Sequence, residues 1–217
     1  MKDKENIVKI IACILIAVLL VIGTTVGLAY GARHVRAVVK LGDITVDWST
    51  VTYVASFYKM KYIEIHDHAD AGDSMKFWQS QTDEGITHAE DFTKEFKEYM
   101  RLTVAKAYLY ITLHGYTQED KLTVAQNSDS VLREYANGSI EEFNHVAEPY
   151  GFDYNDFQNA DALFYKANKA DQLFPSMMGE DEYAKRLEEA CKSVVFNDYY
   201  DKIDVVEVPI INDYYSR

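Results

Sequence analysis

The chain has 217 residues, with 22 Lys and Arg against 35 Asp and Glu, which gives a formal net charge of −13 at pH 7. A surface this acidic repels phosphate backbones and anionic lipid headgroups, so nucleic-acid partners are not expected. Cys13 lies in a long apolar run near the start of the chain, and Cys191 lies in the charged remainder, so no disulfide between the two is expected. The folded part must therefore be stabilised by its own hydrophobic core.

Residues 10–32 form an apolar run without a charged side chain. At about 1.5 Å per helical residue, roughly 20 such residues cross a bilayer core. Three interpretations compete: a lipoprotein signal around Cys13, a cleavable signal peptide ending near Gly31, and an uncleaved signal anchor. The run is longer than the apolar core of a signal peptide, which has about 7–15 residues, and this favours the anchor. We therefore expect a cytoplasmic tail (1–9), a single membrane span (10–32) and an extracytoplasmic domain (33–217) at the cell membrane.

Two stretches of the domain favour β-structure. Residues 36–46 are β-prone and contain a turn at Gly42-Asp43. In residues 203–211, apolar and acidic side chains alternate before the run becomes apolar. An isolated strand of this length is not stable, so we expect the two stretches to pair with each other. Pro209 would restrict the pairing to an edge of the sheet.

The remainder of the domain has the signals of helices. Trp48, Val51, Ala55 and Tyr58 begin an apolar stripe at helical spacing, and a second long stripe runs from Phe92 to Ile111. Helix starts are indicated by capping residues at Asp47, Thr87, Thr117, Ser139, and Asp153 or Asn155. A last helix is indicated over residues 183–195. Neither a repeat nor a linker interrupts residues 33–217, which predicts one domain.

The order of three motifs resembles the SurA/PrsA-type chaperones, in particular their Gram-positive members. These motifs are Val38–Val46, the stretch from Asp83-Glu-Gly-Ile-Thr87 to His114-Gly-Tyr116, and residues 139–157 with their Tyr150-Gly151 stop. The resemblance implies a mainly α fold. An N-terminal transmembrane helix would precede a five-helix SurA N-terminal-like domain, with a small two-stranded sheet joining its first and last segments. Full-length members carry a parvulin domain, but only residues 203–217 follow the last helix, so prolyl isomerase activity is not expected.

The sequence gives little support for catalysis or metal binding. His66, Asp67, His68, Asp70 and Asp73 are the densest group of ligand-type residues, but their spacing does not match an EF-hand. A polar helix end that runs into a loop explains them equally well. Motifs of hydrolases and phosphate-binding loops are missing from the sequence. We therefore expect no enzyme, no metal and no cofactor.

Aromatic residues are abundant, with 17 Tyr, 10 Phe and 2 Trp. Many of them must pack helices together, but those off the stripes or near helix breaks are candidates for a groove that binds unfolded or exported polypeptides. The candidates are Tyr53, Phe57, Phe77, Trp78, Tyr110 and Tyr150. The expected function is a chaperone-like holdase that binds polypeptides without isomerising them. The alternative is a structural or adaptor subunit that docks one dedicated cell-envelope partner.

Overall fold

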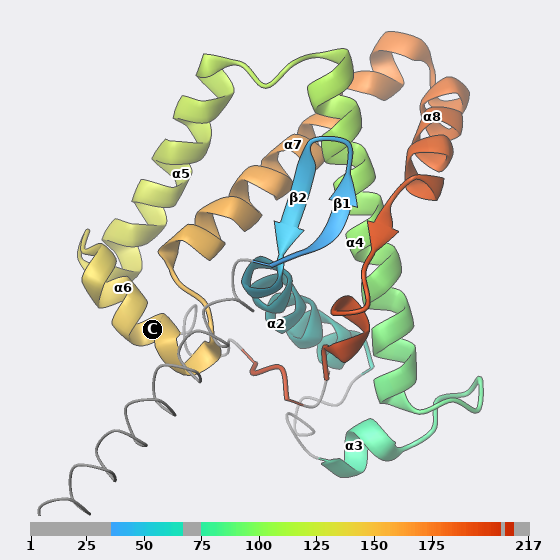
Figure 1. The fold of residues 1–217 in the computed structure, drawn as a ribbon, viewed down its shortest axis with the longest axis vertical. Helices are drawn as coiled ribbons and strands as arrows, with labels where there is room; N and C mark the ends of the chain where they lie inside the picture. Colours follow the sequence, from blue (N-terminus) through green and yellow to red (C-terminus); the bar gives the residue numbers. More distant parts are fainter. Residues whose placement is uncertain (1–35, 67–74, 205–206, 211–217) are drawn as a thin grey trace, which may run out of the picture. The chain divides into compact units, whose positions relative to one another are not determined.

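The structure, a computed structural model, describes residues 36–66, 75–204 and 207–210 (Figure 1). The chain divides into two compact units, Met1–Arg36 and Ala37–Arg217, and every described helix and strand belongs to the second unit. In chain order these are β1 (Ala37–Leu41), β2 (Ile44–Asp47), α2 (Trp48–Ile65), α3 (Met75–Gln79), α4 (His88–Leu113), α5 (Gln118–Ala136), α6 (Ile140–Ala147), α7 (Tyr154–Met178), α8 (Glu180–Lys192) and β3 (Val195–Phe196). Two 3₁₀ turns, η1 (Glu148–Tyr150) and η2 (Tyr200–Lys202), complete the set.

The three strands form one antiparallel sheet in the order β2-β1-β3. A two-residue turn at Gly42-Asp43 joins β1 to β2, and Gly42 has a φ of 56°, which a glycine adopts without a Cβ penalty. On the other edge of β1, Val39 pairs with Phe196. Asn197 extends this edge, because its Nδ2 donates to the carbonyl of Ala37 at 2.7 Å. Both edges of β1 are therefore occupied.

The helix starts follow from local capping. Each cap that the sequence predicts accepts a hydrogen bond from the backbone N–H three residues further on. These caps are Asp47, Thr87, Thr117, Ser139 and Asp153. In α4, α5 and α7 the third residue of the helix also accepts a hydrogen bond from the cap's own backbone N–H.

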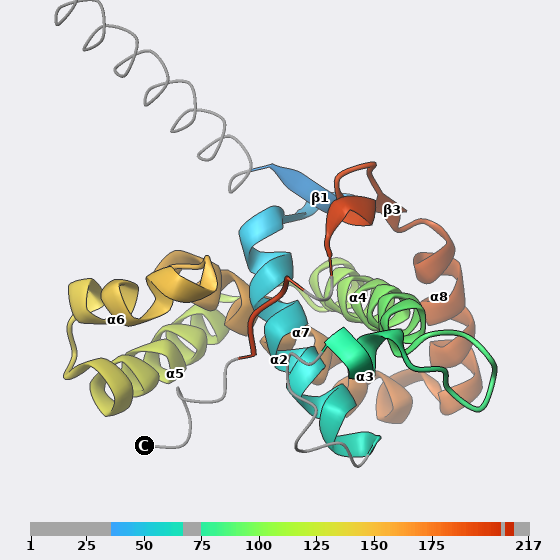
Figure 2. The same cartoon turned by 90° about the horizontal axis from the view of Figure 1, so that it is seen from below.

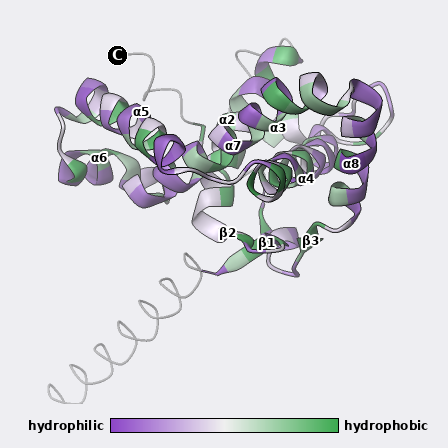
Figure 3. Cartoon of the chain, turned by 90° about the horizontal axis from the view of Figure 1, so that it is seen from above, coloured by the Kyte–Doolittle hydropathy of each residue, from purple (hydrophilic) through white to green (hydrophobic). Residues whose placement is uncertain are grey.

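Helix α7 is the centre of the helical packing. It contacts α4 along much of its length and also contacts α2, α5 and α8. In Figure 2, α5 and α6 lie on one side of α7, while α4 and α8 lie on the other. Figure 3 shows hydrophilic residues along the outer helices α5, α6 and α8, interrupted by single hydrophobic positions. That pattern is typical of helices that bury one face against a neighbour.

The segment after η2 returns to the core between the helices. Val208 is 4 % exposed, and its carbonyl accepts a 2.6 Å hydrogen bond from Nζ of Lys59, a side chain of α2 that is itself 0 % exposed. The same ammonium group lies 5.1 Å from the centre of the Trp78 ring. A buried charge is tolerated only with such partners, so Lys59 fixes residues 207–210 to α2.

The predicted fold class is wrong in several respects. The described part of the chain has seven helices rather than five, and a three-stranded rather than a two-stranded sheet. The partner of the first strand is Val195–Phe196, not residues 203–211. The physical reason is the Gly42-Asp43 turn, which folds residues 37–47 into a hairpin, after which β3 takes the remaining edge of β1. Residues 203, 204 and 207–210 contain a turn in which Asp204 accepts hydrogen bonds from the amides of Glu207 and Val208.

The membrane span is not supported as part of the fold. Among residues 36–66, 75–204 and 207–210, no helix combines the length and the apolar character needed to cross a bilayer. The predicted span at 10–32 and the tail at 1–9 lie outside the described residues. The expected placement at the cell membrane therefore stays a prediction from the sequence.

Candidate functional site

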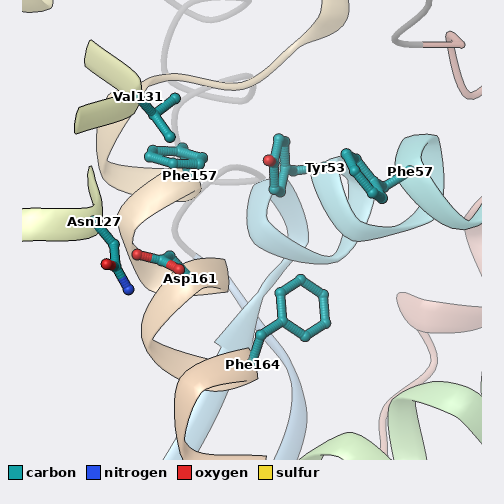
Figure 4. Close-up of a pocket in the computed structure, with 7 residues that line it drawn as sticks. All are labelled: Tyr53, Phe57, Asn127, Val131, Phe157, Asp161 and Phe164. Carbon is teal, nitrogen blue, oxygen red and sulfur yellow. The ribbon is translucent and has the colours of Figure 1, made fainter. Parts of the chain in front are cut away.

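A pocket of about 250 Å³ opens between α2, α5 and α7 (Figure 4). Tyr53 and Phe57 of α2 form one wall, and side chains of α5 and α7 form the others. The lining residues are Tyr53, Phe57, Asn127, Val131, Phe157, Asp161 and Phe164. The volume equals that of roughly eight water molecules and lies below the range of about 300–1,000 Å³ typical of small-molecule sites. The pocket is therefore of the size of one or two side chains.

The wall at Tyr53 is held in place by neighbouring rings. The ring of Tyr53 meets Phe152 edge-on at 4.8 Å between centroids and meets Phe157 at 6.0 Å. Phe157 in turn packs against Phe143 of α6 at 5.5 Å and against Tyr154 at 6.0 Å. The two edge-to-face contacts of Tyr53 and the two tilted contacts of Phe157 fix the ring orientations beyond what area burial alone achieves.

Two hydrogen bonds join the helices that form the walls. Ser49, in the first turn of α2, donates to Asp156 in the first turn of α7 at 2.5 Å. Ser128 of α5 donates to Oδ2 of Asp161 on α7 at 3.1 Å. Burial raises the pKa of Asp156, while its hydrogen bond from Ser49 acts in the opposite direction. These contacts set the spacing of α2, α5 and α7 around the pocket.

Asp161 is the charged group of the pocket. Burial raises the pKa of its carboxyl group, and the hydrogen bond from Ser128 lowers it by less. No Lys or Arg of the described residues forms an ion pair with Asp161. Above its pKa the carboxylate is therefore an acceptor at an otherwise mainly apolar surface.

Two of the six predicted groove residues, Tyr53 and Phe57, line the pocket. Tyr53 is buried, whereas Phe57 is 37 % exposed. Tyr150 is half-buried and lies 6.2 Å from Phe152, next to the ring cluster behind the pocket but not on its lining.

The other three predicted groove residues lie in the core. Trp78 is fully buried and stacks with Tyr62 at 6.0 Å, and Phe77 stacks on His88 at 4.4 Å. Tyr110 is 1 % exposed and donates to Asp120 at 2.9 Å. In the described structure these three rings therefore present little surface to a bound polypeptide.

Five lining residues were not predicted from the sequence: Asn127, Val131, Phe157, Asp161 and Phe164. In the sequence, Phe157 and Phe164 stand at the spacing of an apolar helix stripe. Asp161 lies between them at four and three residues' spacing, which places it on the same helix face. A carboxylate in the middle of an aromatic stripe is the signal that could have identified this surface.

Metal-ligating groups are not assembled in the described part of the chain. Within those residues, no three or more His, Cys, Asp or Glu side chains are grouped so that they could hold a metal ion. His66 lies 5.2 Å from His88 between ring centroids, while residues 67–73 of the histidine-aspartate stretch lie outside the described residues.

Comparison with known proteins finds no matching family model, no matching curated protein and no matching solved structure. What the structure defines is a mainly helical domain with a three-stranded sheet and an aromatic pocket. The resemblance to SurA/PrsA-type chaperones stays a prediction from the motifs.

Proposed function

We propose that the domain binds exposed apolar segments of unfolded polypeptides reversibly and keeps them from aggregating, without isomerising prolyl bonds. The observation that carries this proposal is the pocket between α2, α5 and α7, whose opening is bordered by the exposed ring of Phe57. Apolar side chains of a client would replace water at Phe57, Val131 and Phe164. The motif order shared with SurA/PrsA-type chaperones favours the same function.

The geometry of the pocket suits weak and repeated binding. Rings such as Tyr53 are already fixed by their neighbours, so little conformational entropy is lost when a client side chain enters. A pocket of about 250 Å³ can bury only one or two side chains, which limits the affinity of each encounter. The net charge of −13 keeps the complex of holder and client soluble.

The test is the aggregation of a reduced model client, followed by light scattering with increasing amounts of the full-length chain. We expect suppression at a stoichiometric excess of the chain. Phe57→Ser should weaken suppression at least severalfold, because it removes the exposed ring at the opening. Leu102→Ser is the matched control, since Leu102 is 41 % exposed on α4 and does not line the pocket.

Two results would contradict the proposal. An excess of the chain that leaves the scattering curve unchanged would exclude a holdase and favour the adaptor role. Equal loss of suppression in Phe57→Ser and Leu102→Ser would mean that clients do not bind at the pocket. Thermal melts of both variants show whether either change has unfolded the domain.

A further inference from the structure

We propose that the pocket selects polypeptide segments in which a lysine or arginine lies among apolar residues, with the cationic group bound at Asp161 and its aliphatic stem against Phe57 and Phe164. This inference rests on the proposed function and adds a class of client to it. The argument starts from the composition of the lining. Five of the seven lining side chains are aromatic or aliphatic, one is an amide and one is a carboxylate.

The carboxylate is placed where a cation can reach it. Asp161 lies between Phe157 and Phe164 in the sequence of α7 and lines the pocket, and Figure 4 shows its carboxylate on the side of Asn127, below the ring of Phe157. Ser128 is the hydrogen-bond donor to its Oδ2, and the other oxygen, Oδ1, accepts no hydrogen bond from the described residues. A half-buried carboxylate with an unused acceptor is stabilised by a cation that brings its own donors.

Two carboxylates, Asp129 and Asp161, act on Tyr154 in the first turn of α7. Burial raises the pKa of Tyr154, and the negative charges of Asp129 on α5 and Asp161 on α7 raise it further. Both carboxylates therefore contribute to the potential at the seam between α5 and α7. No Lys or Arg of the described residues forms an ion pair with Asp161, so a cationic side chain of a client would not compete with one of these residues.

The shape of the pocket favours long cationic side chains over small ions. Lysine and arginine bury an aliphatic stem along apolar surface while the charged group reaches a polar partner. The rings of Phe57 and Phe164 both line the pocket, and a cation near either ring also gains a cation–π attraction. The pocket volume of about 250 Å³ accommodates one such side chain.

The test uses a fluorescently labelled apolar peptide made in three versions that carry Lys, norleucine or Glu at one central position. Their binding to the full-length chain is measured by fluorescence anisotropy. We expect the Lys peptide to bind about three- to tenfold more tightly than the norleucine peptide, and the Glu peptide to bind most weakly. Asp161→Asn should abolish the preference for Lys, so that the Lys and norleucine peptides bind this variant with about equal affinity.

The control for overall charge is Glu189→Gln on the exposed face of α8, which changes the net charge by the same amount away from the pocket. It should keep the preference for Lys. Asp161→Asn retains an oxygen that can accept from Ser128, so we expect it to fold. In the wild-type chain, raising the ionic strength from about 0.1 to 1 M shortens the screening length from about 10 to 3 Å. This should reduce the preference for Lys without any substitution.

The outcomes separate this inference from the proposed function. If all three peptides bind equally and Phe57→Ser weakens them all, the holdase proposal stands and the selection of cations is refuted. A preference that survives Asp161→Asn also refutes it, because the acidity of the whole surface would then be the cause. If none of the peptides binds, both proposals fail. Self-association that Phe57→Ser abolishes would assign the pocket to a second copy of the chain and overturn the inference.

Discussion

Asp120 is a buried carboxylate whose charge is fully satisfied by its neighbours. It is 6 % exposed and accepts hydrogen bonds from the hydroxyl groups of Tyr110 at 2.9 Å and Tyr165 at 2.8 Å. The backbone N–H and the hydroxyl group of Thr117 each donate to its other oxygen at 2.8 Å. Burial acts to raise the pKa of Asp120, but these hydrogen bonds outweigh it and lower the pKa to about 2.

We predict that Asp120→Asn lowers the free energy of unfolding by about 2 kcal/mol at pH 6. A carboxylate whose folded pKa lies below its unfolded value stabilises the fold above the unfolded pKa. That contribution is lost as the pH falls from about 4 through the folded pKa of about 2. The difference between variant and wild type should therefore disappear near pH 2 in chemical denaturation. Asp198→Asn, an exposed control on the same chain, should change stability by less than about 0.5 kcal/mol.

Between the strands, the Gly42 turn combines two constraints at one position. Its φ is 56°, in the left-handed region, and a Cβ built on it would lie 2.7 Å from a ring atom of Tyr108 on α4. The hairpin β1-β2 is therefore pressed closely against α4. A side chain at residue 42 would strain the backbone and displace the ring at the same time.

Gly42→Ala should destabilise the domain by about 2–3 kcal/mol, the sum of left-handed strain and overpacking. Gly85→Ala separates the two effects, because Gly85 also has a positive φ of 80° but has no atom within 4 Å of an added Cβ. For Gly85→Ala we expect the free energy of unfolding to fall by about 1–2 kcal/mol. Both variants are measured by urea titration. Equal losses at the two positions would show that Tyr108 moves aside without cost.

Elements that depend on local signals are the ones that the sequence predicts well. The caps at Thr87 and Thr117 bond to the backbone three residues away, so their signature is contained in four consecutive residues. Helix α3 was missed because five residues have little intrinsic helical stability, and the burial of Phe77 and Trp78 sustains it. Its two rings were therefore assigned to a groove, although tertiary contacts place them in the core.

The sheet and the pocket depend on contacts between residues far apart in the sequence, which local sequence patterns do not predict. Val39 pairs with Phe196, and the choice of residues 195–196 over 203–211 is made by the hairpin and by the end of α8. Tyr53 and Phe57 were found because they lie off the apolar stripe of α2. Phe157, Asp161 and Phe164 were not, since a stripe that lines a pocket and a stripe that fills a core look alike in one sequence.

At the scale of the whole domain, Lys59 connects the last described segment to α2, the first helix among the described residues. Its ammonium group donates to the carbonyl of Val208, and the two residues are separated by 149 positions in the chain. The contact is buried, so its loss leaves a carbonyl without a donor in the core.

We predict that Lys59→Met destabilises the domain by about 2–4 kcal/mol and releases residues 203–210 to proteolysis. Lys61→Met is the control, because Lys61 is an exposed neighbour on α2 and should have an effect below about 0.5 kcal/mol. The measurement is thermal unfolding together with limited proteolysis followed by mass spectrometry. Unchanged cleavage near Val208 in Lys59→Met would mean that packing alone holds the segment.

The pairing of β1 with β3 also sets an order in time. Asn197 reaches back to Ala37 across 160 residues, so a chain emerging from the ribosome has β1 long before it has the partner for that edge. Local contacts, such as the β1-β2 hairpin and the capped helices, can form as they are synthesised, but closure of the sheet must wait for residue 197. Until then the edge of β1 offers unpaired backbone groups to any neighbouring chain. The growing domain is thus itself open to association, and this period ends when the short strand β3 arrives.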